Sequence, residues 1–344
     1  MMTKTEFEKN GFDIIRYIAA FSVMMLHYAS YTMILSDQAA DIMDKTRYIA
    51  LLFPGVVILF AMSGFLIADS LERTVSVKDF LIKRFVRIYP ELWLCTVVNL
   101  AVVSILVPHL LDRGIVRWLV TQIFGIANTP SCLKGFATGS INGALWTVFV
   151  EVQLYVLLAL TYRFLQKMKT GGWVIFLAVL AGMNLLCDMA AGQAGGAIAK
   201  LIERIFLPYA LWFFIGVFCY LKKDRLLSVL KKAFWPLLIL YIVINNMAVT
   251  IPGYYANIFI GLVLPFMVIG CGYCLPKIRI KCDLSYGMFL YHWIVLNIIV
   301  HFNFMNRLPW YVCLLFFIVT TLILAWISQC LVRKIRHVLF PKKC

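Results

Sequence analysis

The strongest constraint on the fold is a series of apolar segments, each about as long as a bilayer is thick. A helix needs roughly 20 predominantly apolar residues to cross the hydrocarbon core, and ten segments of this sequence meet that criterion. Hydrophobic residues make up 63% of the chain, well above the roughly 45–50% typical of a soluble domain. The sequence therefore predicts an all-α, polytopic membrane helix bundle of about ten transmembrane helices, at 12–34, 48–69, 89–110, 144–164, 173–191, 204–220, 233–250, 254–275, 284–304 and 309–332.

The ends of the chain are expected to be short cytosolic tails around one transmembrane domain. The domain is predicted to span 12–332, with tails at 1–11 and 333–344. The first apolar run continues from about Phe12 to Leu35 and lacks a small-x-small cleavage site. We therefore expect it to stay as the first transmembrane helix and not to be removed as a signal peptide.

Basic residues in the connectors predict the orientation. With the N-terminus placed in the cytosol, 23 of the 32 Lys and Arg residues fall on the inner side and eight on the outer side, which leaves only Arg16 inside a helix. This asymmetry follows the positive-inside rule, so it supports cytosolic placement of both ends. The net charge of +16 is then explained by contact with anionic lipid, and nucleic acid is not expected as a partner.

The ten cysteines predict neither a disulfide scaffold nor a metal site. Nine lie in or beside apolar segments or at the cytosolic end, where cysteine behaves as a small hydrophobic residue. Cys271 and Cys274 are three residues apart, but no second ligand pair accompanies them. No metal is expected.

The first predicted helix carries two ionisable residues on one face. Arg16 and His27 are eleven residues apart, which is about 20° more than three whole turns and about 16 Å along the axis. Asp13, three residues before Arg16, can pair with it. Ionisable groups inside a membrane span are usually functional, but Asp13 and Arg16 could also reach the cytosolic interface while His27 bonds within the bundle.

A second candidate lies in DFLIKRFVRIYPELW, residues 79–93, on the cytosolic side where the third helix is expected to begin. Arg84 and Arg87 are one helical turn apart, so two guanidinium groups can converge on one phosphate-bearing ligand, and Lys83 adds charge. The alternative is ordinary positive-inside anchoring, because other inner connectors are equally basic.

The third candidate, Glu151, lies about seven residues into the fourth predicted helix from outside, and His27 lies about fifteen residues into the first from inside. Both positions are then about 8–10 Å below the outer surface. Equal depth permits a pair in which the carboxylate orients the imidazole and stabilises its protonated form. A lone buried carboxyl group would instead be protonated and structural.

Two other apolar segments contain polar residues. VVILFAMSGFLIAD, residues 56–69, places Ser63 and Gly64 in mid-helix, where small residues usually indicate close helix packing and where a serine nucleophile lacks its GxSxG setting. LSYGMFLYHWIVLN, residues 284–297, carries Tyr286 and, near mid-membrane, His292. Ser63, Tyr286 and His292 are candidates, with Asp13, for substrate contact or structural support.

One outer connector is long enough to hold further structure. RGIVRWLVTQIFGI, from Arg113, is apolar but too short to span, so we expect it to lie in the interface or to re-enter. ANTPSCLKGFATGSING, from Ala127 to Gly143, is rich in small and polar residues. Such a segment suits a hydrophilic acceptor or a solvated linker equally well.

Taken in order, these stretches resemble the acyltransferase-3 family of membrane O-acyltransferases. The resemblance covers residues 13–293 and rests on RYIAAFSVMMLH, SGFLI, KRFVRIYP, WTVFVEVQLY and SYGMFLYHW. It implies ten helices and acyl transfer from cytosolic acyl-coenzyme A to a hydroxyl of an extracytoplasmic glycan or similar acceptor. It also implies that His27 acts in catalysis, that Arg16 is essential beside it, and that Arg84 and Arg87 contact the coenzyme A.

The leading hypothesis is thus a bacterial inner-membrane O-acetyltransferase that modifies a polysaccharide. Acetyl-coenzyme A would be held by Arg84 and Arg87. His27, assisted by Glu151 or by Arg16, would act as general base on the acceptor hydroxyl or would first carry the acyl group itself. The sequence leaves the acceptor, the acyl chain length and the oligomeric state open, a homo-oligomer included.

The competing hypothesis is a proton-coupled secondary transporter. Asp13, Arg16, His27 and Glu151 would then form a proton relay. Transporters tend to show internal repeats and helices broken by Gly or Pro at corresponding positions, and neither feature is visible in this sequence. A third class, a structural scaffold, would need neither Arg16 nor His27.

Overall fold

The computed structural model describes residues 7, 9–107, 113–247, 251–278, 280 and 282–339. All regular structure in these ranges is helical, as the sequence predicts, and they contain no strand. Parts of both predicted tails, and the ends of the predicted spans 89–110 and 233–250, lie outside the described residues.

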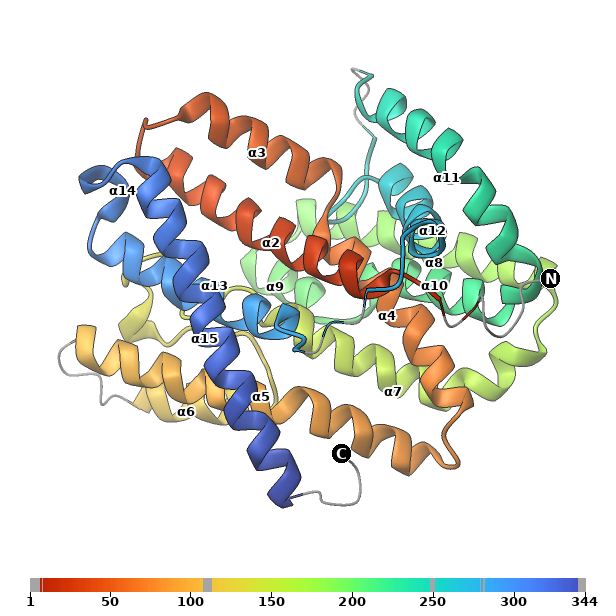
Figure 1. Cartoon of the computed structure of the whole chain (residues 1–344), viewed down its shortest axis with the longest axis horizontal. Coiled ribbons are helices and arrows are strands. Elements are labelled where there is room, and N and C mark those ends of the chain that lie inside the picture. Colours follow the sequence, from red (N-terminus) through yellow and green to blue (C-terminus); the bar gives the residue numbers. More distant parts are fainter. Residues whose placement is uncertain are drawn as a thin grey trace. The chain divides into compact units, whose positions relative to one another are not determined.

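Figure 1 shows the helices in chain order from red to blue. The described elements are α2 (Phe12–Leu35), α3 (Ala40–Leu52), α4 (Gly55–Glu72), α5 (Val77–Leu106), α6 (Arg113–Ile123), the 3₁₀ turn η1 (Ser131–Leu133), α7 (Trp146–Lys167), α8 (Thr170–Gln193), α9 (Gly196–Arg204), the 3₁₀ turn η2 (Leu207–Tyr209), α10 (Ala210–Leu221), α11 (Lys223–Asn245), α12 (Ile258–Cys274), α13 (Ser285–His301), α14 (Phe304–Arg307) and α15 (Trp310–Leu339).

Seven helical segments in the described part of the chain are long and apolar enough to cross a membrane, so the chain is a multi-pass membrane protein. A bent pair, Ile198–Arg204 with Leu207–Leu221, would make eight, and α12 is a shorter apolar helix. The predicted count of about ten and the cytosolic location of both ends remain predictions. The seven segments are Phe12–Leu35, Ala40–Glu72, Val77–Leu106, Trp146–Lys167, Thr170–Gln193, Lys223–Asn245 and Trp310–Arg336.

Two predicted spans are broken or displaced for identifiable reasons. The predicted span 48–69 is divided between α3 and α4, because Pro54 stands at the N-cap of α4 with φ −64° and ψ 114° and interrupts the helix. Helix α5 begins at Val77, twelve residues before the predicted start of the span 89–110. Ser76 caps it, since Ser76 Oγ accepts from the Asp79 N–H at 3.1 Å and donates to the Asp79 carboxylate at 2.8 Å.

The internal contacts of the chain divide it into two compact units. The first unit comprises 1–19, 51–80 and 150–280, and the second comprises 20–50, 81–149 and 281–344. The boundaries fall within α2, α3, α5 and α7, and between α12 and α13. The single domain predicted at 12–332 therefore stays a prediction.

In the first unit, α4 and α10 pack with their backbones in contact. A Cβ atom at Gly64 would lie 1.9 Å from the carbonyl oxygen of Phe213, and one at Gly216 would lie 2.0 Å from that of Ala61. Each helix thus places a glycine where the other helix passes closest. The close packing predicted at Ser63 and Gly64 is confirmed.

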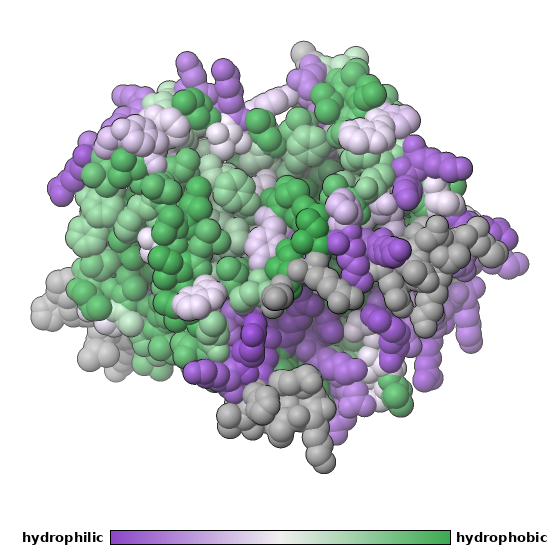
Figure 2. Space-filling view, in the orientation of Figure 1, coloured by the Kyte–Doolittle hydropathy of each residue, from purple (hydrophilic) through white to green (hydrophobic). Residues whose placement is uncertain are grey.

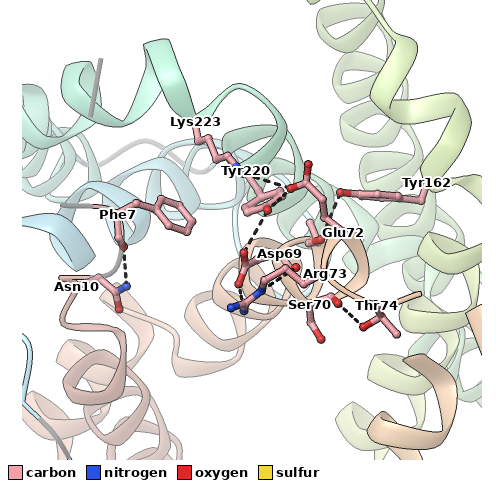
Figure 3. A network of polar contacts seen from close by, with 11 residues as sticks. Phe7, Asn10, Asp69, Ser70, Glu72, Arg73, Thr74, Tyr162, Tyr220 and Lys223 are labelled. Atoms are coloured by element: carbon pink, nitrogen blue, oxygen red, sulfur yellow. Dashed lines mark hydrogen bonds and ion pairs between the residues drawn. The ribbon is translucent and has the colours of Figure 1, made fainter. Parts of the chain in front are cut away.

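A polar cluster holds the C-terminal end of α4 in the same unit (Figure 3). The Tyr220 hydroxyl lies 3.1 Å from Asp69 Oδ1 and also bonds to Glu72, and Arg73 pairs with Asp69. Lys223 Nζ lies 3.3 Å from Glu72 Oε2 and 3.9 Å from the centre of the Tyr220 ring. These contacts join the end of α4 to the turn between α10 and α11.

In the second unit, α13 is a core helix, and every residue from Gly287 to Asn297 is buried. It packs against α15, where a Cβ atom at Gly287 would lie 2.7 Å from that of Ala325. The opposite side of α15 is apolar and exposed, and forms part of the green surface in Figure 2. One face of α15 therefore packs on α13 while the other suits lipid; its exposed residues include Tyr311, Leu315, Val319, Ile323, Trp326 and Leu331.

Candidate active site

His27 of α2 and His292 of α13 lie side by side in the second unit. Nδ1 of His27 is 2.8 Å from Nε2 of His292, and the two ring planes differ by only 6°. His292 is completely buried, whereas His27 is partly exposed. Two histidines that are 265 positions apart in the sequence thus form one hydrogen-bonded pair.

The surroundings of His292 determine where the protons of the pair lie. Its Nδ1 is 3.1 Å from the carbonyl oxygen of Met288, and since a carbonyl oxygen only accepts, this nitrogen carries a proton. Nε2 of the neutral His292 is then an acceptor, so Nδ1–H of His27 donates to it. Nε2 of His27 is left with an unshared electron pair, as a general base or nucleophile requires.

Trp293 connects the His27 ring to the polar loop Ala127–Gly143. The indole meets the edge of the imidazole, with ring centres 4.6 Å apart and planes at 70°. Its Nε1–H points to Thr138 Oγ1 at 3.0 Å and to the Ser140 carbonyl oxygen at 3.1 Å. The loop therefore lies against the side chain that contacts His27.

Asn297, completely buried on α13, fixes the same loop. Its Oδ1 accepts from the Thr138 N–H at 3.2 Å and from Thr138 Oγ1 at 2.7 Å, and its Nδ2 donates to the Ser140 carbonyl oxygen at 2.9 Å. Tyr31 of α2 donates to the Thr138 carbonyl oxygen at 3.2 Å. Ala137 is held in the left-handed region at φ 47°, a conformation that persists only where surrounding contacts determine it.

Arg84 and Arg87 lie inside α5 in the second unit, and not in a connector before it. The predicted one-turn spacing therefore holds; Lys83 and Arg87 are exposed and Arg84 is partly buried. The Tyr286 hydroxyl of α13 donates to the carbonyl oxygen of Ile88 at 3.3 Å. Tyr286, a separate candidate in the sequence, thus belongs to the same region as the arginines.

Asp13 and Arg16 form the predicted ion pair in the first unit. Arg16 Nη1 lies 3.2 Å from Asp13 Oδ1, one helical turn away on α2. Both side chains are partly exposed. The pairing is confirmed, and the catalytic role of Arg16 stays a prediction.

Ser63 and Glu151 also meet in the first unit, together with Tyr155. Glu151 Oε1 accepts from Ser63 Oγ at 2.9 Å and from the Tyr155 hydroxyl, and the two hydroxyl oxygens are 2.9 Å apart. Glu151 is therefore not a lone carboxyl group. Its predicted pairing with His27 joins residues of different units and stays a prediction.

Several of these residues were missed in the sequence. Tyr155, Trp293 and Asn297 were not singled out, although Tyr155 follows Glu151 by one helical turn and Asn297 is an amide within an apolar helix. Both patterns are signals of a polar contact inside a bundle. The pairing of His27 with His292 had no such local signal, because it joins two distant helices.

Comparison with known proteins agrees with these features. A family model described as an acyltransferase domain, acyltransferase-3, matches residues 9–329. Nodulation protein 10 of Rhizobium leguminosarum bv. viciae is 28% identical over 333 residues, which cover 85% of this chain and 84% of that protein. An O-acetyl transferase of Shigella phage Sf6 is 24% identical over 337 residues, which cover 95% of this chain and 96% of that protein. No solved structure matches the chain.

Proposed function

Because this chain belongs to the acyltransferase-3 family and is a multi-pass membrane O-acyltransferase, we propose that it moves an acetyl group from cytosolic acetyl-coenzyme A to a hydroxyl of an extracytoplasmic glycan. The acceptor is proposed to be a polysaccharide or another glycan of a bacterial cell envelope, and the membrane its cytoplasmic membrane. Family membership favours this enzyme over a secondary transporter built on the same ionisable groups.

The observation that carries the proposal is the contact of His27 Nδ1 with His292 Nε2 at 2.8 Å, which leaves His27 Nε2 as the nitrogen that can accept a proton. In direct transfer, Nε2 takes the proton of the acceptor hydroxyl as its oxygen attacks the thioester carbonyl carbon. The carbon–sulfur bond then breaks, and the leaving thiolate of coenzyme A receives the proton. His292, bonded on one side to the Met288 carbonyl and on the other to His27, would keep Nε2 of His27 unprotonated and ready to accept that proton.

The same nitrogen is suited to a covalent route. His27 Nε2 would attack the thioester, release coenzyme A and hold the acetyl group until the acceptor oxygen displaces it. Both routes need the tautomer that the contacts of His292 favour. They differ in whether labelled acetyl appears on His27 before any acceptor is present.

The donor is proposed to bind at the cytosolic end of the second unit. Arg84 and Arg87 would hold its phosphate groups with Lys83 nearby, since paired guanidinium groups bind phosphate oxygens in fork geometry. Tyr286 lies at this end of α13, and His292 is six residues further along, about 9 Å in a helix. A thioester that extends along α13 from the arginines would approach the histidine pair.

The acceptor is proposed to approach from the side of the loop Ala127–Gly143. Two features of this loop support that approach, namely its polar composition and its contacts with Trp293 beside His27. Arg16, which the family resemblance implies is essential, and Glu151, which was selected by its depth in the membrane, are both proposed to assist the transfer. Substitution of each tests that role separately.

The test is a labelling experiment on protein purified in lipid nanodiscs. Wild type, His27→Gln and the control His301→Gln, which changes an exposed histidine, are incubated with radiolabelled acetyl-coenzyme A. We expect coenzyme A release by wild type and the control and its loss in His27→Gln. Label on His27 in the absence of acceptor indicates the covalent route. An unlabelled His27 in protein that turns over indicates direct transfer. Activity retained by His27→Gln contradicts the proposal.

A further inference from the structure

The C-terminal helix brings a third arginine to the Arg84 and Arg87 region of the second unit. Arg336 of α15 donates from Nη2 to the carbonyl oxygen of Arg87 at 2.8 Å, across a sequence separation of 249 residues. Arg336 was counted in the sequence only among the basic residues of the inner side. The contact instead places its guanidinium group at the turn of α5 that carries Arg87.

Glu91 lies next to this group of arginines, one turn after Arg87 on α5. Only 6% of its surface is exposed, and its carboxyl group lies within electrostatic range of Arg336, Arg87 and Asp283. A Cβ atom at Gly287 would lie 3.0 Å from Glu91 Oε1. The absence of a side chain at Gly287 is therefore what makes room for the carboxyl group between α5 and α13.

The convergence of charge separates this region from ordinary lipid anchoring. Positive-inside anchoring needs basic side chains near the membrane surface but does not require them to meet. Here the Arg336 guanidinium donates to the backbone of Arg87, and Arg84 lies one turn earlier on the same helix. Guanidinium groups gathered in one place are suited to a ligand with several negatively charged oxygens.

We propose that Arg336 is a third phosphate-binding residue of the acyl-donor site. Arg84, Arg87 and Arg336 together would take a ligand that carries phosphate groups at more than one position, as coenzyme A does with its pyrophosphate and its ribose phosphate. This inference rests on the proposed function, because it assigns the same donor to the same region.

The experiment compares Arg336→Gln with Arg333→Gln. Arg333 is an exposed arginine one turn earlier on α15, so the control removes the same charge from the same helix. Binding of radiolabelled coenzyme A to each variant in nanodiscs is measured by equilibrium dialysis. Turnover is then measured with acetyl-coenzyme A and with S-acetylpantetheine, which has the same thioester but no phosphate.

We expect Arg336→Gln to weaken coenzyme A binding about tenfold to a hundredfold, the size of a lost hydrogen bond to a charged group. The KM for acetyl-coenzyme A should rise while turnover of S-acetylpantetheine is unchanged. Arg333→Gln should stay within about twofold of wild type. A structural role would lower turnover of both thioesters alike, and that result would overturn the inference, as would equal binding by Arg336→Gln and Arg333→Gln.

Arg336→Lys provides a second variant if Arg336→Gln does not purify as a folded protein. It keeps the charge but loses the planar fork, so a several-fold loss of coenzyme A binding with unchanged S-acetylpantetheine turnover is expected, and no loss overturns the inference. Failure of the wild-type protein to bind coenzyme A would contradict both the proposed donor and this site. If the wild-type protein binds coenzyme A, and Arg84→Gln weakens the binding while Arg336→Gln does not, only this inference is contradicted.

Discussion

Nδ1 of His27 lies 2.8 Å from Nε2 of His292, and the opposite nitrogen of His292 faces a backbone carbonyl. This is the arrangement of a base that is held in one tautomer by a second residue. In the proposed mechanism, the orienting role that a carboxylate has in a Ser-His-Asp triad would belong to the buried imidazole of His292.

The first prediction concerns His292. His292→Leu should lower kcat by about 10² to 10⁴-fold, because His27 loses the acceptor that fixes its tautomer; the orienting residue of a serine protease triad is worth about 10⁴. His292→Gln, whose side chain also offers an acceptor, should retain part of the activity. The measurement is coenzyme A release at saturating acetyl-coenzyme A, with coenzyme A binding as the check on folding. Full activity in His292→Leu would show that the pair is structural.

The second prediction concerns the loop held by Asn297. Asn297→Leu removes four hydrogen bonds to the loop and takes the Asn297 partner from the Thr138 N–H and the buried Ile141 carbonyl oxygen, at about 1–3 kcal/mol for each group left unsatisfied. Amide hydrogen exchange at 136–142 should become at least about tenfold faster. The matched control is Asn306→Leu, an exposed asparagine on α14, for which exchange in the loop should stay as in wild type. Equal loop protection in the two variants would mean that other contacts fix the loop.

The third prediction compares the effect on turnover of losing the Glu151 carboxylate with that of losing Tyr155, one of its hydroxyl donors in the first unit. Glu151→Gln should lower turnover about 10²-fold if the carboxylate takes part in proton transfer. Tyr155→Phe removes one hydrogen bond to it and should lower turnover about tenfold. The control is Tyr162→Phe, on the same helix, whose hydroxyl bonds to the Ala68 carbonyl oxygen. The double variant Glu151→Gln with Tyr155→Phe should be no slower than Glu151→Gln alone, and additive losses would contradict a shared role.

The fourth prediction tests the contact of α4 with α10. Gly64→Ala places a methyl group 1.9 Å from the Phe213 carbonyl oxygen, so the helices must separate and the protein should lose most of its folded yield. Gly182→Ala, in mid-helix α8 with nothing within 4 Å of the new methyl group, should be neutral or stabilising by about 0.5–1 kcal/mol. The measurement is monodisperse yield and thermal unfolding in detergent. A normal yield of Gly64→Ala would show that this packing adapts.

The sequence was a good guide to local features of the fold. The helical class, the Asp13 to Arg16 pair and the close packing at Gly64 follow from hydrophobicity and from spacing along one helix, and all three are confirmed. Helix starts were less accurate, because the cap formed by Ser76 and Asp79 extends α5 into a charged stretch that hydropathy alone assigns to a connector.

The arrangement of the site could not be predicted in the same way. The contacts of His27 with His292 and of Arg336 with Arg87 join residues that are hundreds of positions apart, and periodicity within one helix does not report on such pairs. The pairing of His27 with Glu151 was chosen by equal depth in the membrane, and it stays a prediction. The contact of His27 with His292 had to be read from the structure.

The burial of α13 has a consequence for where the two substrates can react. Tyr286 at its donor end, His292 in its middle and Asn297 at its loop end belong to one continuous helix, so their separations are set by a rise of about 1.5 Å per residue. A bound donor that displaced Tyr286 along the helix axis would displace His292 and Asn297 by the same distance. With the donor and the acceptor bound at these two ends as proposed, the distance between their sites would be set by the length of one helix, and neither site could shift along it without the other.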